Sequence, residues 1–369
     1  MLVARFARIS AVCLAFLGAT LSPSFAIPML LVDAQTLKVI YAEDAGQPWH
    51  PASLTKLMTA YVTFAAIKAG RVSLDTPVTI SQHAWNQAPA KSGLEIGESV
   101  SLKDGLYIML VKSANDMAVA IAETVGGNEK TFVAQMNLMA QQMGLSATHY
   151  DNANGLKDAG QVSSARDLAV LSLYVQRDYP EYAPIFSTQW VQLGAKKLET
   201  SNGLLQHFEG ATGMKTGFIC QSGLNIVATA ERDGRALLAV VLGASSVRER
   251  NELVAQMFLR GFSGALTAMP SSVLDLKDID ADPIDMSQMI CGKKAKAYIK
   301  QREADFPMGL KGQPSYLTDK IVGPTYVATE LGKVVNVPLP RPRPDNAPLL
   351  GTPSPPVAGA RNPPLAIAN

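Results

Sequence analysis

Two pairs of short β-prone segments lie far apart in this sequence, and they constrain its fold more than any other feature. The first pair, Met29–Asp33 and Lys38–Ala42, flanks a short turn near the start of the chain. The second pair, Leu224–Ala230 and Ala236–Leu242, flanks Asp233-Gly234, and Asp-Gly is a strong signal for a tight hairpin. We predict one sheet assembled from both ends of a domain, with helices packed on it.

The sequence between the two hairpins has mostly helical periodicity. Over residues 70–176 the apolar residues and the capping signals predict successive helices at Ser101–Val111, Asp116–Val125 and Glu129–Met143. A last helix is predicted over Glu249–Phe262, after the second hairpin. The fold class is therefore α/β or α+β.

A hydroxyl and an amine lie one helical turn apart at Ser53 and Lys56. Apolar residues recur from Leu54 onward with the period of one buried helix face, which predicts a helix from near Ser53 to Gly70. Free N–H groups at a helix start stabilise negative charge, and a partly buried lysine can be neutral and accept the serine proton. Ser53 is thus a candidate nucleophile, although a capping serine beside a solvated lysine has the same spacing.

Two further motifs accompany this pair. Ser113-Ala114-Asn115 lies at a break between two predicted helices, where a helix cap is the simpler interpretation of the triplet taken alone. Lys215-Thr216-Gly217 precedes the second hairpin, and we predict a strand edge that approaches a ligand there, because glycine permits close approach. Ser-x-x-Lys, a Ser-x-Asn-type motif and Lys-Thr-Gly occur together in class A β-lactamases and penicillin-binding proteins.

With these motifs the chain resembles a low-molecular-mass penicillin-binding protein, a serine-type D-alanyl-D-alanine carboxypeptidase that trims peptidoglycan stem peptides. The resemblance covers about residues 27–262 and extends to Pro51–Thr59, Asn154-Gly155-Leu156 and Gly213–Phe218. It implies the penicillin-binding protein/serine β-lactamase-like fold, an antiparallel sheet flanked by helices plus a mostly helical subdomain. It also implies covalent inhibition by β-lactam antibiotics.

The resemblance implies chemical roles for individual residues. Ser53 would attack the carbonyl between the two terminal D-alanines, and Lys56 would accept its proton. Ser113 and Lys215 would relay a proton to the departing D-alanine. The backbone N–H groups of Ser53 and Phe218 would form the oxyanion hole, where each donor contributes roughly 3 kcal/mol.

Substrate binding would fall to a second group of residues. Asn115 would hold the penultimate amide of the substrate. The strand at Gly217 would lie beside the bound substrate. Thr216 and an arginine after the last strand would bind the terminal carboxylate, with Arg250 as the first choice and Arg248 as the alternative. No metal and no cofactor is expected.

The first 26 residues have the pattern of a signal peptide. Arg5 and Arg8 precede the apolar run Ile9–Ala19, and Ser24-Phe25-Ala26 suits signal peptidase. The run is shorter than the roughly 20 residues that span a bilayer, which favours cleavage over an uncleaved anchor. We predict an exported protein, in the periplasm or at the outer face of the inner membrane, with its membrane association left open.

The C-terminal third has a weaker pattern. Residues 263–336 form an extension of uncertain fold, and residues 337–369, which hold ten of the 23 prolines, are predicted to be disordered. Cys220 and Cys291 remain as an even pair after the signal peptide is removed, and we predict a disulfide between them.

Charge and histidine placement weigh against other classes. Without its first 26 residues the chain carries 31 basic and 31 acidic residues, so nothing indicates a nucleic-acid partner. A Ser-His-Asp hydrolase is disfavoured because no Gly-x-Ser-x-Gly occurs and the four histidines lie in no motif. A serine β-lactamase lacks support because no Glu-x-x-x-Asn follows Ser113-x-Asn115. A non-catalytic cell-wall binding module is less consistent with three intact motifs.

Overall fold

The computed structural model describes residues 27–333. The predicted signal peptide, residues 1–26, and the predicted proline-rich tail, residues 337–369, lie outside the described residues. All the helices and strands described below lie between these two predicted segments.

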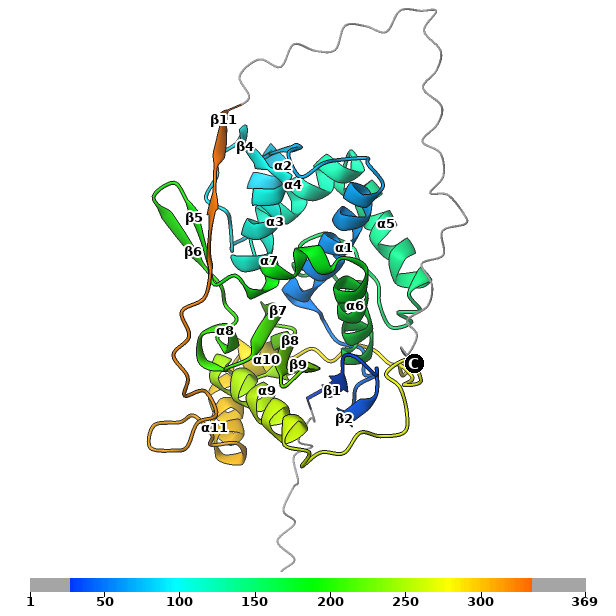
Figure 1. Cartoon of the computed structure of the whole chain (residues 1–369), viewed down its shortest axis with the longest axis vertical. Helices are drawn as coiled ribbons and strands as arrows, with labels where there is room; N and C mark the ends of the chain where they lie inside the picture. Colours follow the sequence, from blue (N-terminus) through cyan, green and yellow to red (C-terminus); the bar gives the residue numbers. More distant parts are fainter. Residues whose placement is uncertain (1–26, 334–369) are drawn as a thin grey trace, which may run out of the picture.

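Both ends of the predicted domain contribute to one antiparallel sheet (Figure 1). Its strand order is β2-β1-β9-β8-β7. The five strands are β1 (Met29–Asp33), β2 (Val39–Glu43), β7 (Ala211–Ile219), β8 (Gly223–Arg232) and β9 (Arg235–Ala244). Both predicted hairpins are confirmed, and the antiparallel pairing of β1 with β9 joins them. The strand that carries Lys215-Thr216-Gly217 is an edge strand, as predicted.

The sheet separates two apolar layers because alternate residues of a strand point to opposite faces. In β9, Leu238 and Val240 belong to the core shared with the helical part, whereas Leu237 and Val241 belong to a second core. The second core is closed by helix α9 (Val247–Phe262). Helix α6 (Ala165–Asp178) contributes to the first core, on the other face.

The segment between the hairpins is mostly helical, as predicted. After the short 3₁₀ helix η1 (Ala52–Thr55) it contains α1 (Lys56–Lys68), α2 (Gln82–Trp85), α3 (Leu102–Val111), α4 (Asn115–Gly126), α5 (Glu129–Gln142), α6, and the strands β3 (Pro77–Thr79) and β4 (Glu98–Ser101). The predicted cap at Ser101 is confirmed, because its Oγ accepts a hydrogen bond from the backbone N–H of Asp104 at 3.1 Å. Figure 1 shows α2 to α5 grouped on one side of the sheet.

Helix α1 is more deeply buried than its periodicity suggested. We predicted one buried face, yet the residues from Lys56 to Phe64 are all buried. The reason is that α3, α4, α5 and α6 all contact α1, so that no face of this stretch is left for solvent. The nucleophile motif therefore lies at the start of the central helix of the helical part.

The prediction that Glu249–Phe262 is the last helix is wrong. Two helices follow it, α10 (Ser287–Ile290) and α11 (Ala295–Asp305), and then the strands β10 (Thr325–Ala328) and β11 (Glu330–Lys333). Helix α11 buries none of its residues, so it has no clear apolar face for a sequence pattern to reveal.

The two late strands pair with segments far away in the sequence (Figure 1). Strand β10 pairs in parallel with β5 (Trp190–Leu193), whose hairpin partner is β6 (Lys196–Glu199), and β11 pairs with β4. The ring of Tyr326 stacks on Tyr107, and its hydroxyl donates to Asp104 Oδ1 at 2.6 Å. The chain between α6 and β7 also contains the short elements η2 (Pro180–Tyr182), α7 (Ala183–Ser187) and α8 (Leu204–His207).

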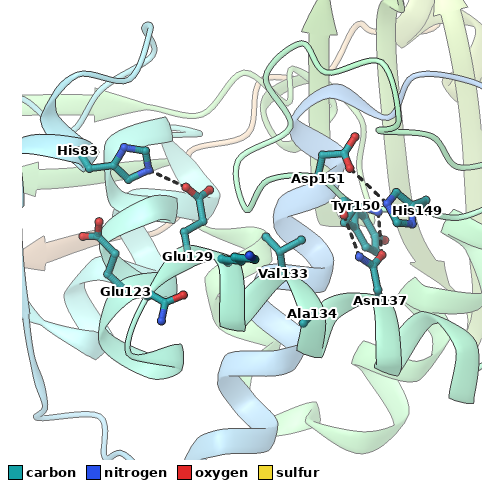
Figure 2. Close-up of a pocket in the computed structure, with 11 residues that line it drawn as sticks. His83, Glu123, Glu129, Val133, Ala134, Asn137, His149, Tyr150 and Asp151 are labelled. Atoms are coloured by element: carbon teal, nitrogen blue, oxygen red, sulfur yellow. Dashed lines mark hydrogen bonds and ion pairs between the residues drawn. The ribbon is translucent and has the colours of Figure 1, made fainter.

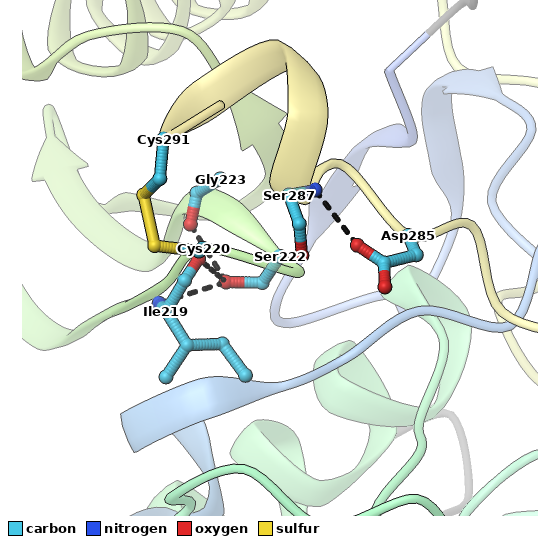
Figure 3. Close-up of a disulfide and its surroundings, with 7 residues drawn as sticks. All are labelled: Ile219, Cys220, Ser222, Gly223, Asp285, Ser287 and Cys291. Carbon is cyan, nitrogen blue, oxygen red and sulfur yellow. Dashed lines mark hydrogen bonds between the residues drawn. A yellow bond between two sulfur atoms is a disulfide. The ribbon is translucent and has the colours of Figure 1, made fainter. Parts of the chain in front are cut away.

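The predicted disulfide between Cys220 and Cys291 is present (Figure 3). It joins the turn after β7 to the end of α10, 71 residues further along the chain. Beside it, the backbone N–H of Met286 donates to the carbonyl of Gln221 at 2.9 Å. A closed loop of this size stabilises a protein by about 4 kcal/mol in the chain-entropy model.

None of the helices within residues 27–333 has both the length and the apolar character needed to span a bilayer.

Candidate active site

Ser53 is held in a short 3₁₀ turn, η1 (Ala52–Thr55), directly before α1. The residues that precede it are fixed to the sheet and its turns. Trp49 Nε1 donates to the carbonyl of Ser222 at 2.9 Å, and Asn225 Nδ2 donates to the carbonyl of His50 at 2.9 Å. The serine thus occupies the start of a helix, as predicted, and its backbone is anchored by two strongly buried side chains.

Lys56 is fully buried and its amine has three close partners. Its Nζ lies 2.9 Å from Ser53 Oγ, 2.7 Å from Asn115 Oδ1 and 2.6 Å from the backbone carbonyl of Asn154. The alternative of a solvated lysine beside a capping serine is therefore wrong. Ser53 is the N-cap residue of neither η1 nor α1; these positions are held by Pro51 and Thr55.

Burial, reinforced by the nearby Lys215, lowers the pKa of Lys56 well below its ordinary value, while Asp116 opposes the shift. A neutral amine has two N–H groups and one lone pair. Asn115 Oδ1 and the Asn154 carbonyl can only accept hydrogen bonds in this arrangement, so they take the two N–H groups. The lone pair is then directed at Ser53 Oγ, which is the geometry that a general base requires.

The Ser113 motif lies in the break between α3 and α4, as predicted. Ser113 has φ of 65°, a left-handed conformation that is rare outside glycine and clusters at functional sites. Its Oγ accepts a hydrogen bond from Lys215 Nζ at 2.8 Å. Asn115 begins α4, and its Nδ2 donates to the carbonyl of Ala88 at 2.9 Å while its Oδ1 faces Lys56.

Lys215 reaches the site from the edge strand β7. It is buried, and burial together with the charge of Arg250 lowers its pKa to about 7. An amine with this pKa exchanges protons readily near neutrality. Its hydrogen bonds to Ser113 Oγ and to the Thr216 carbonyl place it in a continuous polar group with Ser113.

Glycine is required where β7 passes the serine. A Cβ added to Gly217 would lie 2.9 Å from the carbonyl oxygen of Pro51 and 3.0 Å from the backbone nitrogen of Ser53. This close approach was predicted for the Lys-Thr-Gly motif. The next residue, Phe218, exposes half of its side chain. The oxyanion-hole role of the Ser53 and Phe218 backbone N–H groups stays a prediction.

Arg250 rather than Arg248 lies beside the motif on β7. One of its terminal nitrogens, Nη2, donates to the carbonyl of Ser201 at 3.0 Å, and Ser201 Oγ lies 2.6 Å from Thr216 Oγ1. Burial lowers the pKa of Arg250 to about 10. Arg248 instead donates to the backbone carbonyls of Phe306 and Met308.

Two contributors to this site were not assigned as site residues from the sequence. The Asn154 carbonyl is a backbone acceptor, which no residue pattern identifies, although Asn154-Gly155-Leu156 was noted as part of the resemblance. Ser201 lies in an unpatterned loop that only the fold brings to Thr216. Within residues 27–333, no group of three or more metal-binding side chains occurs.

Residues 24–246 match a protein family described as D-alanyl-D-alanine carboxypeptidase, Peptidase_S11. The chain belongs to this family. The match covers all three motifs, and the structure brings those motifs together around Ser53.

Individual relatives agree with this membership. The chain is 38% identical over 233 residues to D-alanyl-D-alanine carboxypeptidase DacD of Salmonella typhimurium, which covers 60% of this chain and 59% of the relative's length. It is similar in structure to penicillin-binding protein 5 of Haemophilus influenzae, with a TM-score of 0.61, 34% identity, and coverage of 64% of this chain and 70% of the other.

A third similar structure is penicillin-binding protein D2 of Listeria monocytogenes in its cefotaxime-bound form. The TM-score is 0.58 and the identity 29%, with 64% of this chain and 96% of the other chain covered. The fold is therefore that of the penicillin-binding proteins, as the sequence predicted.

Proposed function

We propose that this protein is a serine-type carboxypeptidase that removes the terminal D-alanine from peptidoglycan stem pentapeptides. The observation that carries the proposal is the environment of Lys56. Its amine is buried, lies 2.9 Å from Ser53 Oγ, and has its remaining hydrogen-bonding capacity taken by Asn115 and Asn154. Such an amine can deprotonate the serine and has little capacity left for other hydrogen bonds.

Acylation begins with attack of Ser53 Oγ on the carbonyl carbon of the scissile D-Ala-D-Ala bond, as the proton passes to Lys56 Nζ. The tetrahedral oxyanion accepts hydrogen bonds from the backbone N–H groups of Ser53 and Phe218. The carbon–nitrogen bond then breaks. The leaving amine takes up a proton through Ser113 and Lys215, whose pKa of about 7 suits a proton relay.

Deacylation uses the same groups in the opposite order. After D-alanine leaves, Lys56 releases the proton that it took from Ser53 and Lys215 regains one, both by exchange with solvent. Water then attacks the Ser53 ester, Lys56 accepts a proton from the water, and it returns that proton to Ser53 Oγ as the shortened peptide leaves. Asn115 still has one N–H group free of the contacts described above, and it can donate to the penultimate amide of the substrate.

The terminal carboxylate of the substrate is assigned to Thr216 and Arg250. A guanidinium binds a carboxylate through two parallel hydrogen bonds, and burial of Arg250 strengthens that attraction. Ser201 orients both partners, since its carbonyl accepts from Arg250 and its hydroxyl contacts Thr216.

Penicillin and related β-lactams are proposed covalent inhibitors, because their strained amide and carboxylate can occupy the positions of the scissile bond and terminus. The cefotaxime-bound relative supports this assignment. We place the protein outside the cytoplasm, in the periplasm or at the outer face of the inner membrane. The disulfide supports an oxidising compartment.

The test combines a labelled penicillin with a D-Ala-D-Ala peptide. The purified protein should form a stable adduct on the Ser53 peptide, detected by mass spectrometry, and should release D-alanine over many turnovers. Ser53→Ala should abolish both signals. Rapid penicillin turnover without D-alanine release would instead identify a β-lactamase, and the absence of both reactions would identify a binding module.

Arg250→Ala should lower kcat/KM for the peptide by about 10²-fold, since the loss of a charge-assisted pair with the substrate carboxylate is worth roughly 3 kcal/mol. The measurement is D-alanine release at several peptide concentrations. Arg248→Ala is the matched control on the same helix and should change kcat/KM little. The reverse pattern would move the carboxylate site to Arg248.

A further inference from the structure

A second polar region lies in the helical part, in an open pocket of about 600 Å³ (Figure 2). Two pairs of side chains face each other across it. His83 Nε2 lies 2.7 Å from Glu129 Oε2, and His149 Nε2 lies 3.2 Å from Asp151 Oδ1. The proposed reaction uses none of these four residues.

Glu129 differs from the other three because it also contacts the chain behind the pocket. Its Oε2 faces His83, whereas its Oε1 accepts a hydrogen bond from the backbone N–H of Ala153 at 3.0 Å. The Glu129 side chain is 17% exposed and that of His83 is 57% exposed. The carboxylate is thus a bridge between a surface histidine and a buried loop.

The loop that Glu129 holds, residues 152–155, provides an acceptor to the general base. Ala153 is fixed on both sides, because its carbonyl also accepts from Thr59 Oγ1 at 2.6 Å. The next carbonyl, that of Asn154, accepts from Lys56 Nζ at 2.6 Å. Three hydrogen bonds, joined by the backbone between Ala153 and Asn154, therefore connect His83 through Glu129 to Lys56.

We propose that Glu129 is a positioning residue for Lys56, which sets the place of the Asn154 carbonyl and thereby the direction of the lysine lone pair. This inference rests on the proposed function, in which Lys56 is the base for acylation of Ser53 by the substrate. It assigns no contact with the substrate to Glu129, so its effect should appear in the acylation rate constant and not in substrate binding.

The physical basis is the sensitivity of proton transfer to geometry. The loop has no regular secondary structure, and hydrogen bonds on either side of Ala153 hold its neighbours. Asn152 is bonded to Gln161 and Gly155, and Asn154 Nδ2 donates to Gln87, while the carbonyl of Ala153 accepts from Thr59. None of these hydrogen bonds is donated by the backbone N–H of Ala153, so removal of Glu129 takes away the acceptor that holds this N–H. A shift of about 1 Å in a reacting group can lower a rate by about 10²-fold.

The experiment measures labelled-penicillin acylation by stopped flow over a range of drug concentrations, which separates the non-covalent Kd from the acylation rate constant. Glu129→Ala should lower the rate constant by about 10-fold or more and leave Kd unchanged. Glu129→Gln retains an oxygen acceptor for Ala153 and should stay within about threefold of the wild type. Glu123→Ala, on the same pocket wall, is the matched control.

His83→Ala is a second variant that leaves α5 untouched in case Glu129→Ala does not fold. It removes the hydrogen bond that orients the carboxylate and should lower the acylation rate constant on the order of threefold, again with unchanged Kd.

The inference is overturned if Glu129→Ala acylates at the wild-type rate, if Glu129→Gln is as slow as Glu129→Ala, or if the change lies in Kd. A wild-type protein that forms no Ser53 adduct would instead refute the proposed function itself. The two failures are thereby distinguished.

Discussion

Lys56→Met is expected to lower the rate of Ser53 acylation by about 10²–10⁴-fold, the range that a positioned general base contributes. Methionine fills a similar volume but has no lone pair of comparable basicity. The serine then lacks a proton acceptor, since Lys215 contacts Ser113 and not Ser53. The rate of labelled-penicillin adduct formation measures the effect.

Lys68→Met provides the control for this variant. Lys68 lies at the other end of α1, where its ammonium contacts the ring of Tyr179. It should acylate at the wild-type rate. If Lys56→Met also acylates at the wild-type rate, another group must be the base and the central assignment fails.

The wild-type pH profile should carry the signature of the same amine. Because the pKa of Lys56 lies well below its ordinary value, its neutral form is present at lower pH than for a free lysine. Acylation should rise with pH through that lowered pKa and fall again as Lys215, whose pKa is about 7, loses the proton that it relays to the leaving amine. The rise should be absent from the residual reaction of Lys56→Met.

Gly155→Ala is expected to lower the free energy of unfolding by about 3–5 kcal/mol, the range of severe backbone strain and overpacking. Its φ is 84°, and an added Cβ would lie 1.9 Å from the carbonyl oxygen of Ala52. Backbone must move to relieve that clash, and the backbone concerned leads directly into Ser53. Urea unfolding and adduct formation should therefore both be impaired.

Gly127→Ala separates the cost of the left-handed backbone conformation from the cost of the clash with Ala52. Gly127 has a similar φ of 77°, but an added Cβ would meet nothing within 4 Å. It should cost only the left-handed strain, about 1 kcal/mol, and leave acylation unchanged. If both substitutions lower the free energy of unfolding equally, the clash with Ala52 does not contribute to the destabilisation.

Much of the fold could be predicted from local pattern. The two hairpins, the Ser101 cap and the helices around Ser113 arise from turn residues, capping residues and apolar periodicity, which are properties of neighbouring positions. The disulfide was also predicted, because only two cysteines lie after the predicted signal peptide.

The missed elements depend on distant partners. Strands β10 and β11 form because β5 and β4 offer them free edges, and α11 has no buried face of its own. The burial of α1 on all sides from Lys56 to Phe64 likewise results from the helices around it. Such pairings are not determined by the residues within a segment, so a pattern within that segment cannot reveal them.

For the site, the sequence by itself determined which chemical groups are present: the hydroxyl of Ser53, the amine of Lys56 and the two accompanying motifs. Only the tertiary structure decided how they can react. Complete burial makes the neutral form of Lys56 accessible, and the Asn154 carbonyl directs its lone pair. The fold also brings Arg250, and not Arg248, to Ser201 beside Thr216, which is why we propose Arg250 as the carboxylate-binding residue. The physical reason is that desolvation and backbone acceptors depend on what surrounds a residue in space, which its neighbours in sequence do not specify.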